Sequence, residues 1–127
     1  MAKTEIRTPD APPPPAAFSQ GVRKGNILQV AGQVAFDAAT GAVVGTTVAE
    51  QTRQAFKNVI AVLEAGGASL EDVVMLRVYL TDTAHFAEMN EAYGEFLTVP
   101  PLSARTTVYV GLPEGLLVEI DALAVLD

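Results

Sequence analysis

The first third of the chain shows the alternation of polar and apolar residues that is typical of β-strands. Over residues 4–8, uncharged and charged residues alternate, which predicts a short edge strand. Four consecutive prolines then interrupt regular structure, because proline has no N–H to donate. Residues 18–22 and 27–36 predict two more strands, and residues 23–26 between them predict the turn of a hairpin.

Apolar residues recur at helical spacing in two later segments. Thr47 and Glu50 have the spacing of a capping box, and the helix that they begin is predicted to end at the glycine pair of residues 66–67. A second helix is predicted from residue 81 or 82 through residue 97. Its inward stripe is expected to consist of Phe86, Met89, Tyr93, Phe96 and Leu97.

The remaining strands determine the predicted fold class. Residues 73–80 are apolar except for Arg77, which predicts a central strand, and residues 105–110 and 116–126 predict two closing strands. The order predicts an α+β fold, a single domain over residues 1–127 with a mixed β-sheet and two helices packed on one face. The other face would stay uncovered in a monomer, so we expect subunits to pack on it.

Charged residues interrupt the two closing strands. Glu119 and Asp121 are two residues apart and therefore share one face, and Arg105 precedes them on what we predict to be the neighbouring strand. A structural salt bridge between the two strands is one interpretation, because an unpaired buried carboxylate is costly. The other is an anion-binding cleft in which the guanidinium of Arg105 binds a substrate carboxylate. These residues alone favour the salt bridge.

Gly32 and Asn90 also interrupt apolar segments. Glycine inside a strand marks a β-bulge or the close approach of a ligand to the backbone, and the bulge is the commoner cause. Asn90 falls on the apolar stripe of the second helix, where its amide either caps a loop or faces a pocket. The structural role is again the commoner one.

Composition narrows the functional classes. Half of the 127 residues are hydrophobic, and the formal net charge of −7 argues against general binding of nucleic acids or anionic membranes. The chain has no cysteine and one histidine, so we expect neither a metal site built from these residues nor a thiolate nucleophile. No apolar run approaches the roughly 20 residues of a membrane span, and no hydrophobic signal segment opens the chain, which predicts a cytoplasmic protein.

Separated segments of the chain resemble the YjgF/RidA family over essentially its whole length. The matching segments are Gln20-Gly21-Val22, Gly25-Asn26, Ala31-Gly32-Gln33, Glu64-Ala65-Gly66-Gly67, Asn90 with Tyr93, Ser103-Ala104-Arg105-Thr106 and Val118-Glu119-Ile120-Asp121-Ala122. The resemblance implies a chorismate-mutase-like fold assembled as a homotrimer, with three clefts between subunits.

The resemblance also implies an activity. RidA proteins detoxify reactive intermediates: they hydrolyse enamines and 2-imino acids, such as 2-aminoacrylate and its imine tautomer, to 2-oxo acids and ammonia without a cofactor. Arg105 matches the family arginine that binds the substrate carboxylate, and Glu119 matches the glutamate that positions the attacking water. Gly32 matches a backbone contact in the cleft, and Asn90 matches a polar position near it. A 2-iminobutanoate/2-iminopropanoate deaminase-like hydrolase is therefore our first expectation.

Three positions of the expected cleft depart from RidA itself. Phe18 replaces a tyrosine, Ala31 a serine and Thr107 a cysteine, so we expect a more apolar pocket with a different substrate preference. Two alternatives remain open at this point: a non-catalytic trimer that binds small carboxylates, and an endoribonuclease-type translation inhibitor. The acidic charge and the lack of a suitable nucleophile and general-base histidine count against the ribonuclease.

Overall fold

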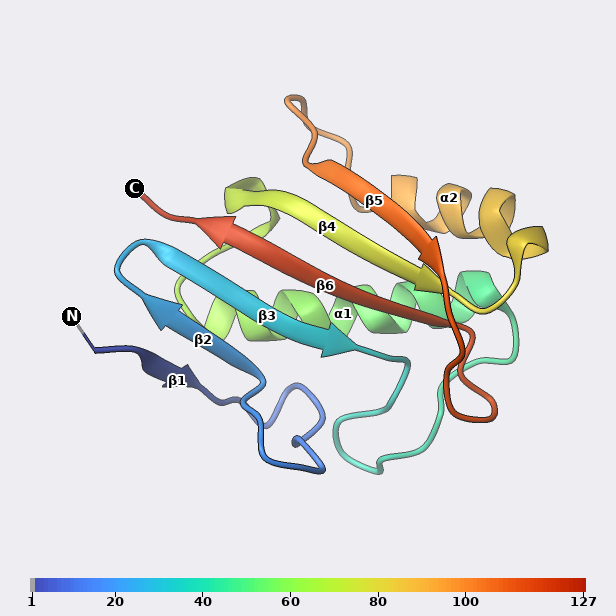
Figure 1. The fold of residues 1–127 in the computed structure, drawn as a ribbon, viewed down its shortest axis with the longest axis horizontal. Helices are drawn as coiled ribbons and strands as arrows, with labels where there is room; N and C mark the ends of the chain where they lie inside the picture. Colours follow the sequence, from blue (N-terminus) through green and yellow to red (C-terminus); the bar gives the residue numbers. More distant parts are fainter. Residues whose placement is uncertain (1) are drawn as a thin grey trace.

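The computed structural model describes residues 2–127, which fold into a six-stranded sheet with two helices on one face (Figure 1). The strand order is β1-β2-β3-β6-β4-β5. Only β4 and β5 run parallel, so the sheet is mixed, as predicted. The strands are β1 (Thr4–Ile6), β2 (Gly21–Lys24), β3 (Ile27–Gln33), β4 (Val73–Leu80), β5 (Ala104–Tyr109) and β6 (Val118–Val125).

The first helix, α1 (Val48–Ala65), begins as its sequence predicts. Thr47 and Glu50 form both hydrogen bonds of the capping box, and Gly66 caps the other end. The second helix, α2 (Phe86–Gly94), is shorter than predicted. A 3₁₀ turn, η2 (Thr83–His85), precedes it, and after its last residue the hydrogen bonds join residues three apart, as in a 3₁₀ turn. A further 3₁₀ turn, η1 (Leu70–Asp72), leads into β4.

The predicted hairpin joins β2 to β3, but its turn is tighter than residues 23–26. Lys24 pairs with Ile27, which leaves a two-residue turn in which Gly25 has a φ of 61°. Glycine suits this left-handed conformation because it has no Cβ to clash with the backbone. The predicted strand over residues 18–22 begins only at Gly21, and Phe18 lies in the loop before it.

The strand β3 ends at Gln33, three residues earlier than predicted. Its pairing with β6 shifts in register between Val30 and Gln33, which confirms a β-bulge around Gly32. Beyond the bulge, Phe36 makes only an isolated bridge to Val43. The bulge thus ends regular pairing and lets the chain leave the sheet.

The core lies between the sheet and the two helices. Alternate residues of β6 are completely buried on this side, and Phe56 of α1 stacks on Phe96 at 4.6 Å and meets Tyr93 edge-on at 5.3 Å. Because both helices cover the same face, the opposite face remains open along β4 and β6 (Figure 1). No helix within residues 2–127 is long and apolar enough to cross a membrane.

Candidate functional site

The strand order separates Arg105 from Glu119. Arg105 lies on the edge strand β5 and pairs with Leu76, whose side chain is completely buried beneath the helices, so Arg105 also faces the helix side. Glu119 lies on β6 between two completely buried residues and therefore faces the open side. The predicted ion pair from Arg105 to Glu119 and Asp121 is wrong, because β4 lies between β5 and β6.

Asp121 finds its partners on β4 instead. Its carboxylate accepts hydrogen bonds from Arg77 Nε at 2.9 Å and from the Tyr79 hydroxyl at 2.7 Å. The bond to Asp121 raises the pKa of Arg77 and also that of Tyr79, because both protons are held by the carboxylate. A salt bridge between neighbouring strands therefore exists, with Arg77 as the cation in place of Arg105.

Glu119 has no such partner among residues 2–127. Its side chain is half-buried, and burial raises the pKa of its carboxyl, helped by the negative charge of Asp121 on the same face. Gly32 lies directly against it, since a Cβ at Gly32 would come within 2.7 Å of Glu119 Oε2. A carboxyl with a raised pKa is suited to take and return a proton near neutral pH.

Glu119 lies at the edge of a cavity of about 530 Å³. Two other predicted site residues, Phe18 and Gly32, also line it, whereas Ala31 does not and its N–H donates to the carbonyl of Gln20. The remaining lining residues are Pro12, Pro13, Pro14, Pro15, Gln20, Gln33, Val34, Phe36, Gly41, Leu112, Pro113 and Leu116.

The proline segment and the loop over residues 112–116 are cavity walls that sequence reasoning missed. The four prolines predict only an interruption of regular structure, and nothing in their local pattern indicates which strand they approach. The position of Phe18 three residues after the last proline is the one signal that links this segment to the expected cleft.

The other predicted site residues gather at the α2 edge of the sheet. The guanidinium of Arg105 lies over the rings of Tyr93 at 4.7 Å and Phe86 at 5.6 Å. Asn90 shares their face of α2, four residues after Phe86 and three before Tyr93, and Thr107 shares the face of Arg105 on β5. Asn90 Oδ1 and Thr107 Oγ1 are both buried without a hydrogen-bond partner among the described residues.

Six of the seven predicted residues thus form two groups in one chain. The Glu119 group, Phe18, Gly32 and Glu119, lies at the cavity, and the Arg105 group, Asn90, Arg105 and Thr107, lies on the opposite face of the sheet. Ala31 stands apart from both groups.

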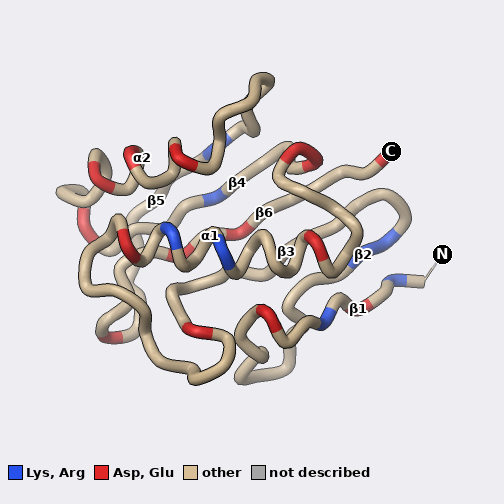
Figure 2. The backbone as a smooth tube through the Cα atoms, turned by 180° about the vertical axis from the view of Figure 1, so that it is seen from behind, with Lys and Arg blue, Asp and Glu red and all other residues tan. Residues whose placement is uncertain are grey.

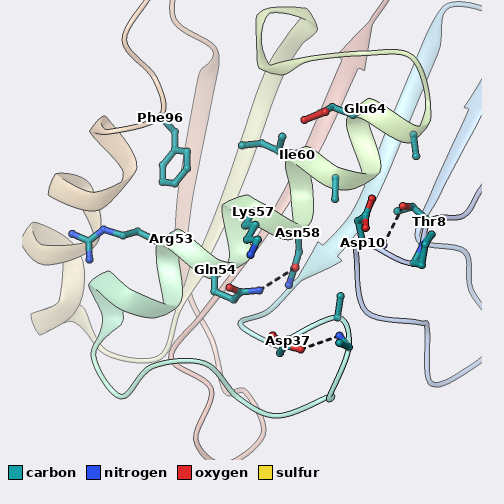
Figure 3. Close-up of a pocket in the computed structure, with 15 residues that line it drawn as sticks. Thr8, Asp10, Asp37, Arg53, Gln54, Lys57, Asn58, Ile60, Glu64 and Phe96 are labelled. Atoms are coloured by element: carbon teal, nitrogen blue, oxygen red, sulfur yellow. Dashed lines mark hydrogen bonds between the residues drawn. The ribbon is translucent and has the colours of Figure 1, made fainter.

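A larger hollow, about 930 Å³, lies elsewhere, over the outer side of α1 (Figure 3). Several of its polar side chains are already hydrogen-bonded within the chain. Arg53 is paired with Glu95, while Gln54 and Asn58 donate to the carbonyl of a loop residue, and Asp37 accepts from the backbone of its own turn. None of the predicted site residues lines it, so we place the candidate chemistry at the smaller cavity.

Comparisons with known proteins agree with this fold. A family model described as Endoribonuclease L-PSP matches residues 8–126. A RutC family protein of Pyrococcus abyssi is 44% identical over 125 residues, which are 98% of this chain and 98% of that protein. A Dermatophagoides farinae protein named 2-iminobutanoate/2-iminopropanoate deaminase is 36% identical over 126 residues, again 98% of each chain.

A solved structure extends the similarity to three dimensions. RidA from an Antarctic Psychrobacter bacterium superimposes with a TM-score of 0.91 at 38% identity, over 97% of this chain and 99% of that one. Sequence identity and coverage at this level indicate common ancestry as well as a common fold. The chain therefore belongs to the YjgF/RidA family.

Proposed function

We propose that this protein is a cofactor-independent deaminase that hydrolyses 2-aminoacrylate-type 2-imino acids to 2-oxo acids and ammonia. The observation that carries the proposal is the carboxyl of Glu119, which is half-buried at the edge of an apolar cavity and has a raised pKa. The relative named 2-iminobutanoate/2-iminopropanoate deaminase, which matches this chain over 98% of its length, supports the same activity.

The chemistry needs one group that takes a proton and gives it back. Glu119 removes a proton from water as the water oxygen bonds to the imine carbon, and the π electrons of the C=N bond move to nitrogen. The nitrogen takes this proton back from Glu119, which gives a neutral carbinolamine. Glu119 then removes the hydroxyl proton as the C=O bond forms and the C–N bond breaks, and it passes that proton to the nitrogen, which leaves as ammonia. Imino acid and water thereby become 2-oxo acid and ammonia, and the carboxylate is regenerated.

The substrate carboxylate needs a cation, and we assign this role to Arg105. A guanidinium binds a carboxylate through two parallel hydrogen bonds, and the rings of Tyr93 and Phe86 hold the guanidinium of Arg105 in place. Arg105 and Glu119 face opposite sides of one sheet. We therefore propose a homotrimer in which the Arg105 group of one subunit completes the cleft of the Glu119 group of the next.

The activity can be tested by making the imine in place. A dehydratase acting on serine or threonine releases 2-aminoacrylate or its four-carbon homologue, and formation of the 2-oxo acid is followed with and without this protein. We expect faster hydrolysis, and the Glu119→Gln protein is the matched control. Binding of 2-oxo acids without any acceleration would favour the non-catalytic carboxylate binder instead.

The assembly has its own test. Light scattering should give the mass of three 13.3 kDa subunits at micromolar concentration. A mass of one subunit would remove the cleft between subunits and, with it, the meeting of Arg105 and Glu119.

The ribonuclease activity in the family model's description is not favoured for this chain. The net charge is −7, and the lysine and arginine positions are spread over separate elements among more numerous acidic ones (Figure 2). Binding to a phosphate backbone needs a concentrated basic surface. The charges therefore suit a small substrate better than RNA.

A further inference from the structure

The cavity beside Glu119 has mostly apolar walls with few side-chain hydrogen-bond donors. Four of its lining residues are consecutive prolines, which have no N–H, and Phe18, Leu112 and Leu116 add apolar side chains. Glu119 carries the only charge among the lining residues. A bound molecule would therefore meet one carboxyl group at the edge and hydrocarbon over most of the remaining surface.

The wall built from the proline segment is fixed by Gln20. This side chain is 3% exposed, and its amide nitrogen donates to the carbonyls of Thr8, Ala11 and Pro12. Its amide oxygen accepts from the N–H of Thr8 at 2.7 Å. Gln20 thus holds the proline segment in place, and its amide is occupied by the backbone.

The wall built from the loop over residues 112–116 is fixed in the same way by Gln51 of α1. This side chain is 1% exposed, donates to the carbonyl of Gly115 at 2.7 Å and accepts from the N–H of Leu117 at 2.8 Å. Leu116, which lines the cavity, lies between these two anchored residues. Both walls are therefore formed before any ligand enters, which limits the entropy lost on binding.

We infer that this cavity binds the side chain of the substrate, and that the substrates are 2-imino acids with branched aliphatic or aromatic side chains. The inference rests on the proposed function, because Glu119 would place the imine carbon at the cavity edge. A volume of about 530 Å³ suits a small-molecule site. A methyl side chain would leave most of it to water, whereas each further buried methylene strengthens binding roughly fourfold.

Relative rates on a panel of imines test this inference. An L-amino acid oxidase generates the imines of leucine, phenylalanine, alanine and serine in place, and semicarbazide traps whatever the protein has not hydrolysed. We expect kcat/KM for the leucine and phenylalanine imines to exceed the value for the alanine imine by at least about fivefold. A smaller ratio overturns the inference and leaves the deaminase activity itself intact.

A variant of the wall ties the preference to the cavity. Phe18 lies in a loop and its side chain is 50% exposed, so Phe18→Ser is compatible with the fold. We expect it to lower the ratio of leucine to alanine imine hydrolysis by about fivefold. The matched control is Val99→Ser, a 66% exposed residue that does not line this cavity, and it should keep the wild-type ratio. An unchanged ratio in Phe18→Ser would place the side chain elsewhere.

A binding measurement distinguishes failure of this inference from failure of the proposed function. If no imine is hydrolysed, the deaminase proposal falls together with the substrate assignment, and titration with 2-oxo acids then tests the apolar side-chain site by itself. Binding of 4-methyl-2-oxopentanoate at least about fivefold tighter than 2-oxopropanoate, with NMR shifts at Phe18 and Leu116, supports the apolar site. Equal or absent binding overturns it.

Discussion

The two groups of site residues lie on opposite faces of one sheet. The Glu119 group has a carboxylate but no cation, and the Arg105 group has a cation but no carboxylate, among residues 2–127. The carboxyl of Glu119 is half-buried and pairs with no cation within residues 2–127, and burial and the charge of Asp121 raise its pKa. The guanidinium of Arg105 lies on the aromatic rings of α2 without a carboxylate within 4 Å among residues 2–127. We interpret each group as half of a binding site, because each has the charge that the other lacks.

Asp121 shows what a completed pair looks like in the same sheet. Only two residues from Glu119, it receives hydrogen bonds from Arg77 and Tyr79 on the adjacent strand. The chain thus satisfies the carboxylate that is buried within it and leaves Glu119 for another partner. We interpret Asp121 as a structural residue and Glu119 as the functional one.

The largest expected effect comes from removing the proton acceptor of the Glu119 group. Glu119→Gln can hold a water by hydrogen bonding but cannot readily take its proton. We expect imine hydrolysis to fall about 10² to 10⁴-fold, with binding of 2-oxo acids little changed, as measured by kcat and by titration. A near-normal rate in the folded variant would make Glu119 structural and remove the distinction from Asp121.

A smaller loss should follow from displacing the same carboxyl. In Gly32→Ala the new Cβ would lie 2.7 Å from Glu119 Oε2, so the side chain must move. We expect about a 10²-fold loss in kcat/KM with the fold retained, because misplacing a catalytic group by about 1 Å has this effect. The control is Gly94→Ala, where a Cβ meets nothing within 4 Å. Equal rates in the two variants would show that Glu119 does not need this position.

Replacing the structural carboxylate of Asp121 should lower the free energy of unfolding and not the rate of hydrolysis. Asp121→Asn weakens the bonds to Arg77 and Tyr79, and we expect unfolding free energy to fall by about 1 to 2 kcal/mol in urea titrations. The matched control is Glu95→Gln, which breaks the exposed pair with Arg53 and should cost about 1 kcal/mol or less. A larger loss from Glu95→Gln would reverse this order and show that Asp121 is not the structural anchor of the sheet.

The smallest effect concerns the ionisation of Glu119 itself. Its folded pKa is raised above the ordinary 4.5, so its contribution to stability is full below that pH and is lost as the pH rises through the folded pKa. Glu119→Gln should therefore raise Tm at neutral pH by on the order of 1 to 3 °C, and the difference should vanish below about pH 4. A lower Tm for this variant at neutral pH would mean that the ionised carboxyl stabilises the fold.

The sequence predicted best where the determining interactions are local. The capping box of Thr47 and Glu50 and the glycines after α1 fix the helix ends through contacts within a few residues. The bulge at Gly32 and the alternation along β5 were predictable for the same reason. The ends of α2 were not, because a 3₁₀ turn and an α-helix have similar side-chain patterns.

The arrangement of the site depended on strand order, which no local pattern encodes. Arg105 was assigned to Asp121 because the two strands are consecutive in sequence, but β4 enters between them and brings Arg77 from 44 residues away. Arg77 was visible as the one charge in an apolar strand, yet its partner was not. The proline wall of the cavity likewise arises from the tertiary hydrogen bonds of Gln20.

Hybrid trimers test directly whether Arg105 and Glu119 act across a subunit boundary. The variants Arg105→Ala and Glu119→Gln are produced together with different affinity tags, and two purification steps isolate trimers that contain both. Each variant alone, and a mixture of the two finished homotrimers, are the controls and should be inactive.

In a hybrid trimer, a cleft between subunits can receive an intact Arg105 from one chain and an intact Glu119 from its neighbour. We expect purified hybrids to regain hydrolysis at about one third of the wild-type rate, because one of the three clefts is then complete. Hybrids as inactive as their parents would contradict the shared cleft and place both residues in sites formed within one chain.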